Sequence, residues 1–125
     1  MSGAPVIRVA VLESSPQFTA ALERALVDRP EVDVLWRPYR DDLLEICRST
    51  PLAAVILVIK SDDAALTLLR TVRDLIPDVP LLCVVEELFD EWEWTARELG
   101  ADVVLADVVA KEEFVRSVGR VVGRE

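Results

Sequence analysis

Apolar residues along this chain fall into five short continuous runs, and the segments between them repeat apolar residues every three or four positions. The runs cover residues 7–12, 32–36, 53–59, 81–85 and 103–106. Short runs that are apolar throughout are typical of parallel strands covered on both faces. Asp33 interrupts the second run and charged residues follow it, so we expect this run to be an edge strand.

The segments between the runs predict amphipathic helices. Ser14 or Ser15 can cap the first helix, Pro16 suits its first turn, and Pro30 ends it. Its expected core-facing stripe consists of Phe18, Leu22, Ala25 and Leu26.

The second and third helices have similar start signals. The second is predicted over residues 41–48, with Leu44 and Cys47 facing inward. Ser61 is expected to cap the third, which runs to about residue 75.

Five strands that alternate with five helices, joined by right-handed crossovers, predict a doubly wound α/β sandwich. The chain has 125 residues, of which 52% are hydrophobic, which is enough to fill one core. We therefore expect a single domain over residues 1–125.

The composition excludes several classes of function. A net charge of −9 opposes direct binding to nucleic acid. The absence of histidine removes the commonest metal ligand and the commonest general base. Cys47 and Cys83 do not form a C-x-x-C pair and are expected to be buried, reduced thiols. With no apolar run long enough to span a bilayer and no secretion signal, the chain is expected to be soluble and cytoplasmic, with no membrane contact.

Three segments resemble parts of a known family. Residues 7–16 (IRVAVLESSP) look like a first strand and its acidic corner, residues 77–80 (PDVP) like the entry to a fourth strand, and residues 100–105 (GADVVL) like a Gly-Ala-Asp lead into a fifth. In order and spacing they resemble the response-regulator receiver domain, especially the receivers on helix-turn-helix transcription regulators. The resemblance implies a flavodoxin-like (βα)5 fold with strand order 2-1-3-4-5.

The resemblance also implies where phosphorylation chemistry would lie. Receivers hold Mg²⁺ with two acids after the first strand and an aspartate on the third that accepts the phosphoryl group. The acid pair falls on Glu13 and Ser14. The acceptor falls on Leu57 in an ungapped alignment, or on Ile59 if the following loop is shorter, and neither can form an acyl phosphate.

Two further receiver positions also carry unsuitable residues. The hydroxyl at the end of the fourth strand is replaced by Val85, and the lysine after the fifth strand is replaced by Asp107, followed by Val108 in place of proline. A valine cannot bond a phosphoryl oxygen, and an acid would repel it. We therefore expect no phosphorylation, no Mg²⁺ and no cofactor.

Alternative functions use the same residues. Glu13 and Asp107 allow a general acid–base pair, although acids that cap a helix or face solvent are the simpler interpretation. The hydroxyls at the start of the first helix allow a flavin phosphate, but the chain has no Gly-rich loop, P-loop or nucleophile elbow, so an enzyme is disfavoured. A small-molecule sensor with an apolar pocket at Leu57, Val85 and Val108, or the regulatory half of a longer transcription regulator, remain alternatives.

The fourth predicted helix, roughly residues 89–99, carries an unusual surface. It ends at Gly100, and its expected core stripe is Phe89, Trp92, Ala96 and Leu99. Trp94 projects roughly from the opposite side, among Asp90, Arg97 and Glu98. Asp90 and Glu91 are candidate partner-binding residues beside it in sequence. An outward tryptophan is a candidate anchor for a protein partner.

The last predicted helix begins near Lys111 and places a base at every fourth position. These bases are Arg116, Arg120 and Arg124. A basic stripe could face the acidic fourth helix of a second copy. We therefore expect a phosphorylation-independent regulatory domain that acts through a protein partner or as a homodimer, by its fourth and fifth helices.

Overall fold

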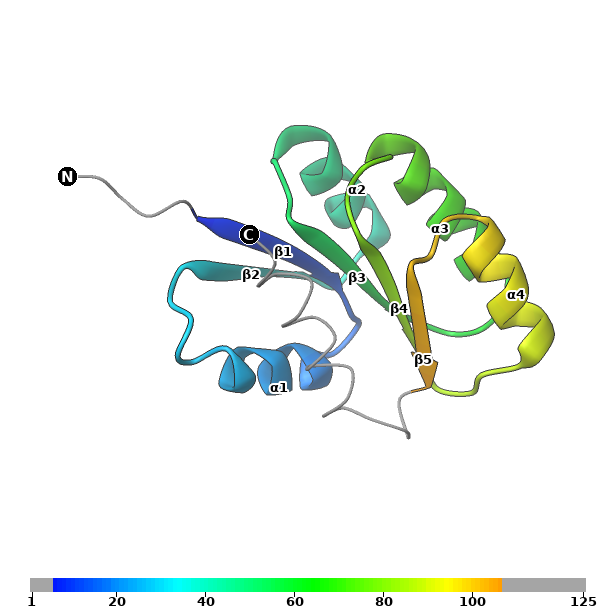
Figure 1. The fold of residues 1–125 in the computed structure, drawn as a ribbon, viewed down its shortest axis with the longest axis horizontal. Coiled ribbons are helices and arrows are strands. Elements are labelled where there is room, and N and C mark those ends of the chain that lie inside the picture. The colour runs from blue at the N-terminus through cyan, green and yellow to red at the C-terminus, as the bar shows by residue number, and fades with distance from the viewer. Residues whose placement is uncertain (1–5, 107–125) are drawn as a thin grey trace.

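The computed structural model describes residues 6–106, which form a parallel five-stranded sheet with helices on both faces (Figure 1). The strand order is β2-β1-β3-β4-β5, as the receiver resemblance predicts, and the interrupted second run does form an edge strand. The bounds match the five apolar runs to within one residue: β1 Ile7–Leu12, β2 Val32–Arg37, β3 Ala54–Ile59, β4 Leu81–Val85 and β5 Val103–Ala106.

Within this range four helices follow the first four strands. They are α1 Gln17–Ala25, α2 Arg40–Ser49, α3 Asp63–Leu75 and α4 Asp90–Glu98. Helix α1 covers one face of the sheet, whereas α2, α3 and α4 cover the other (Figure 1). None of the helices between residues 6 and 106 is long and apolar enough to cross a membrane. The fifth predicted helix, near Lys111, lies outside the described residues.

Alternation of side chains along the strands builds two hydrophobic cores. In β1, Val11 packs on the α1 side of the sheet and Leu12 packs on the side of α2, α3 and α4. In β3, Ile56 packs on the α1 side and Leu57 packs on the side of α2, α3 and α4. Because both faces are covered, the buried positions of a central strand are apolar, which explains why the runs are nearly continuous. Arg8, near the start of β1, is the exception and is only partly buried.

Two predicted helix caps are wrong. Neither Ser14 nor Ser15 caps α1, where Pro16 holds the N-cap position. Helix α3 is capped by Asp62, whose carboxylate accepts a hydrogen bond from Ala65 N at 2.8 Å, and not by Ser61. Serine and aspartate cap helices equally well, so the turn of the backbone after the strand decides between neighbours.

Some predicted core positions also differ. Ala25 is exposed at the end of α1, and α2 buries Leu43 while Leu44 is only partly buried. Phe89 is 53% exposed because it precedes α4 in extended backbone, with φ −105° and ψ 138°. A helical projection that includes this residue therefore places its side chain on the wrong side.

The Gly-Ala-Asp lead into β5 is held by Arg73, near the end of α3. The Arg73 guanidinium donates hydrogen bonds to the carbonyl oxygens of Gly100 at 2.6 Å and Val79 at 2.9 Å, and pairs with the Asp102 carboxylate at 3.0 Å. Gly100 has φ +121°, and a Cβ there would lie 2.6 Å from Arg73 Nε. Glycine is thus required at this turn, which sets where β5 begins.

Candidate functional site

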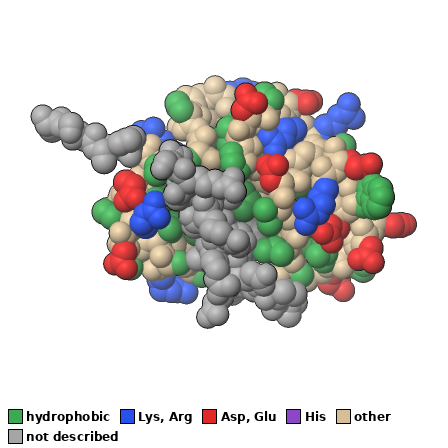
Figure 2. Space-filling model, in the orientation of Figure 1, with side chains coloured by type: hydrophobic (Ala, Val, Ile, Leu, Met, Phe, Trp, Pro, Cys, Tyr) green, Lys and Arg blue, Asp and Glu red, His purple; other side chains and the backbone are tan. Residues whose placement is uncertain are grey.

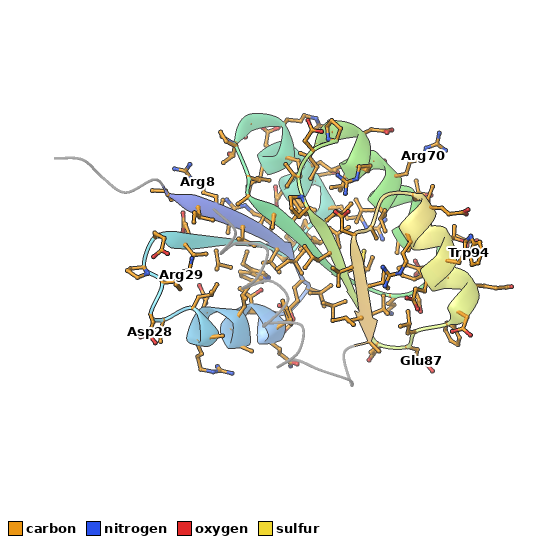
Figure 3. All side chains as sticks on the ribbon, viewed as in Figure 1. Arg8, Asp28, Arg29, Arg70, Glu87 and Trp94 are labelled. Atoms are coloured by element: carbon orange, nitrogen blue, oxygen red, sulfur yellow. The ribbon has the colours of Figure 1, made fainter. Side chains whose placement is uncertain are left out.

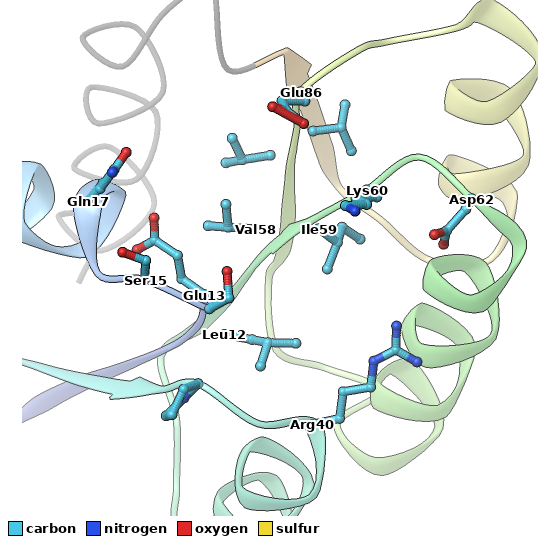
Figure 4. Close-up of a pocket in the computed structure, with 14 residues that line it drawn as sticks. Leu12, Glu13, Ser15, Gln17, Arg40, Val58, Ile59, Lys60, Asp62 and Glu86 are labelled. Carbon is cyan, nitrogen blue, oxygen red and sulfur yellow. The ribbon is translucent and has the colours of Figure 1, made fainter.

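A cavity of about 430 Å³ lies at the carboxyl edge of the sheet, between the segments that follow β1, β2, β3 and β4 (Figure 4). Ligands of doubly wound sheets commonly bind at this edge. Leu57 does not line the cavity but is fully buried beneath it, opposite Cys83 in the strand register, whereas Ile59 does line it. The apolar part of the lining consists of Leu12, Val58, Ile59, Val84 and Val85.

Glu13 is a buried acid at this edge of the sheet, and its carboxylate accepts hydrogen bonds from the start of α1. One oxygen, Oε2, accepts a hydrogen bond from Phe18 N at 2.8 Å. The other, Oε1, accepts from Thr19 N and from Thr19 Oγ1, both at 2.9 Å. Only 6% of Glu13 is exposed. A carboxylate has about four acceptor sites, so most of its capacity is used inside the protein.

These bonds explain how α1 begins without a serine cap. The first backbone amides of a helix have no partner within the helix, and an acid at that end also suits the helix dipole. The Glu13 main chain is held as well, because its carbonyl oxygen accepts a hydrogen bond from Trp36 Nε1 in β2 at 2.7 Å. The amides that a flavin phosphate would need at this helix are therefore already bonded, to Glu13.

Charged side chains of both signs surround the mouth of the cavity. Arg40 and Lys60 line one side, near Asp62, and Glu86 lines another (Figure 4). The exposed Ser14 is also part of the lining. Asp62 already caps α3. Within residues 6–106, no three acidic or cysteine side chains gather closely enough to hold a metal ion.

The two cysteines lie in the hydrophobic core and do not line the cavity. Both are buried free thiols, as predicted. Burial raises the pKa of Cys83 to about 12 and also raises the pKa of Cys47, against the opposing effect of Arg48. Both side chains are therefore protonated near neutral pH, and neither is a ready nucleophile or metal ligand.

The outer face of α4 presents a different kind of surface. Trp92 and Ala96 are buried against the sheet, whereas Trp94 is 69% exposed and points away from the molecule (Figure 3). Acidic side chains gather around this helix (Figure 2), and Asp90 and Glu91 are both exposed. A shallow hollow of about 520 Å³ is lined by Asp90, Glu93, Trp94, Arg97 and Glu98.

Comparison with known proteins places this geometry in a familiar fold. No sequence-family model matches the chain, and no curated protein matches it in sequence. A response regulator from Thermotoga maritima is 16% identical with a TM-score of 0.82, over 94% of this chain and 98% of that one. HP1043, an orphan response regulator of H. pylori, is 16% identical with a TM-score of 0.80, over 96% of this chain and 99% of that one.

A third similar structure is a response regulator protein from Burkholderia pseudomallei with a phosphorylated aspartic acid, a calcium ion and citrate. It is 20% identical with a TM-score of 0.72, over 93% of this chain and 66% of that one. The chain has the receiver fold. At these levels of identity the likeness establishes the fold alone.

The receiver fold brings some of the predicted positions together. Glu13 and Ser14, which follow β1, line one cavity with Val85, the last residue of β4. Leu57 lies below that cavity, and Asp107 falls outside the described residues. On α4, Trp94 and Asp90 line one hollow, while Arg116, Arg120 and Arg124 also fall outside the described residues.

Proposed function

We propose that this chain is a cytoplasmic, receiver-like regulatory domain that works without phosphorylation, through a protein contact on α4. The observation that carries the proposal is that the Glu13 carboxylate is already hydrogen-bonded within the protein. This acid, which the resemblance assigns to Mg²⁺, accepts three hydrogen bonds from the first turn of α1. A Mg²⁺ ion would need those oxygens, and turning them toward it would break the hydrogen bonds that Glu13 accepts from the amides of Phe18 and Thr19.

The rest of the edge supports the same conclusion. Ile59 and Val85 line the cavity but offer neither a phospho-acceptor nor a hydroxyl that could bond a phosphoryl oxygen. Restoring the chemistry would require several simultaneous changes, in addition to releasing Glu13 from α1. We therefore propose that signals reach this domain, or leave it, by binding alone and that it catalyses no reaction.

The proposed contact surface is the outer face of α4. An exposed tryptophan can supply much of the energy of a protein interface, and acidic neighbours favour a partner with a basic surface. The sequence predicts a basic stripe on the last helix of a second copy, which makes a symmetric homodimer the arrangement we propose. Its basic residues would be Arg116, Arg120 and Arg124. With a net charge of −9, the chain is not expected to contact nucleic acid directly.

A small-molecule sensor is the second candidate, and the cavity at the carboxyl edge favours it. A volume of about 430 Å³ with a lining that is part apolar and part charged is within the size range of small-ligand sites. This candidate places the function at the sheet edge and leaves α4 without a role.

Purification from the native host, in parallel for the wild-type chain and Trp94→Ala, separates the two candidates. We expect a protein partner, or a differently tagged second copy, to accompany the wild type and to be lost from the variant. Mass spectrometry of the same samples should find no stoichiometric small molecule. A small molecule that both proteins retain would favour the sensor and contradict the proposed contact.

A further inference from the structure

Helix α4 has little stability of its own. It is only nine residues long, and its N-cap residue Phe89 makes no side-chain capping bond. Of its side chains, Trp92 and Ala96 are buried. Short helices form mainly because tertiary contacts hold them, so the position of α4 depends on what it touches.

Two side-chain hydrogen bonds join α4 and the loop before it to the loop after β3. Ser61 Oγ donates to the carbonyl oxygen of Glu87 at 2.7 Å. Trp92 Nε1 donates to the carbonyl oxygen of Asp62 at 3.0 Å. Each bond links segments that are 26 or 30 residues apart in sequence. Because both acceptors are backbone atoms, the bonds fix main chain as well as side chains.

Both hydrogen bonds involve the residues just before α3, and this end of α3 is itself held by hydrogen bonds. Asp62 accepts a hydrogen bond from Ala65 N through its side chain, and from Leu66 N through its carbonyl oxygen at 3.3 Å. Helix α3 has 13 residues and buries Ala65, Leu68, Leu69 and Val72. The two bonds therefore tie the weaker helix to the stronger one.

We propose that Trp92 and Ser61 are positioning residues that hold α4 in one orientation and so fix the direction of Trp94. Residues two apart in a helix point in roughly opposite directions, since they differ by about 200° around the axis. A rotation or shift of α4 that pulls Trp92 from Asp62 therefore also moves Trp94 on the outer face. The link to partner binding rests on the proposed function, but the hold on α4 does not.

Amide hydrogen exchange tests the hold on α4 directly. Trp92→Phe keeps an aromatic ring in the core but removes the indole N–H, and Ser61→Ala removes the hydroxyl. In the double variant, amides of residues 86–98 should exchange about tenfold faster, while those of α3 and the central strands stay unchanged. Ser49→Ala is the matched control, because its hydroxyl bonds the Glu45 carbonyl within a single helix at 2.8 Å.

The result separates failure of this proposal from failure of the proposed function. Exchange in residues 86–98 that is unchanged in the double variant, or that rises equally in α3 and the strands, would overturn the positioning role. If exchange rises locally, association through Trp94 should weaken about tenfold in the same variant. Faster local exchange in a chain that never associates would uphold the positioning role and contradict the α4 contact.

Discussion

The acids Glu13 and Asp62 at the carboxyl edge of the sheet are hydrogen-bonded within the protein, whereas Trp94 on the outer face of α4 is exposed. At the edge, Glu13 and Asp62 are bonded to the first amides of α1 and α3. On α4, Trp94 is 69% exposed, and the nearby Arg97 pairs with Glu93 at 3.0 Å and donates to the Asp102 carbonyl oxygen at 3.4 Å. A reactive site needs polar groups that can turn to a substrate, whereas a binding surface needs exposed apolar area. This contrast supports our proposal that α4 is the functional region.

An aspartate placed at the carboxyl edge should destabilise the fold and should not restore phosphorylation. Leu57→Asp puts a carboxylate at a fully buried core position and should lower the free energy of unfolding by about 3–5 kcal/mol. Ile59→Asp, at the partly exposed cavity lining, should cost clearly less. Urea denaturation measures both. A Leu57→Asp protein that is as stable as wild type and accepts a phosphoryl group would show that the edge is still a reactive site.

Removing the buried acid should also destabilise the fold. Glu13→Ala removes the hydrogen bonds that the carboxylate accepts from the amides of Phe18 and Thr19 and should cost about 1–3 kcal/mol. Glu23→Ala, at an exposed position of α1, is the matched control and should change stability little. Equal unfolding curves for Glu13→Ala and the control would mean that the carboxylate is not needed for α1 and is free to bind an ion.

Changes at the proposed contact should affect association and leave folding intact. Trp94→Ala removes the proposed anchor, and Arg120→Glu places like charges opposite each other, so each should weaken a dimer by about 1–3 kcal/mol. Arg70→Glu, on the exposed side of α3, should have no such effect. Circular dichroism should match wild type in all three. Sedimentation over a concentration series decides: a wild-type chain that stays monomeric, or a dimer indifferent to both changes, would place the contact elsewhere.

The crowded acids around α4 should give a small response to salt. Added NaCl screens repulsion among exposed acids such as Glu87, Asp90 and Glu91, and should raise the melting temperature by about 1–3 °C. Glu91→Gln should reduce this response, since it removes one of the repelling charges. Melting curves that coincide at low and high salt would indicate that these charges do not repel each other appreciably.

The strands could be predicted from the sequence, but the hydrogen-bond partners of individual polar groups could not. Continuous apolar runs follow directly from a sheet covered on both faces, so the strand bounds needed no tertiary information. The bonding of Glu13 depends on where α1 begins in space, five and six residues further along the chain. Helix capping is one of two simple interpretations of Glu13, and the sequence alone does not decide between a cap and an acid that faces solvent.

The prediction for α4 shows the same limit on a smaller scale. Helical periodicity placed Trp92 inward and Trp94 outward, and both positions are confirmed. The same periodicity failed at Phe89, where the backbone is still extended. The bonds of Ser61 and Trp92 to distant carbonyl groups join segments that no local pattern connects.

Independence from phosphorylation can be measured on the purified chain. Incubation with acetyl phosphate and Mg²⁺, or with beryllofluoride and Mg²⁺, should leave the intact mass, the tryptophan fluorescence and the oligomeric state unchanged. The fluorescence is informative because Trp36 bonds the Glu13 carbonyl and Trp92 bonds the loop after β3, so a change at the edge would reach either ring. An unchanged mass and spectrum is the predicted result. A stoichiometric phosphoryl adduct on any aspartate would contradict it.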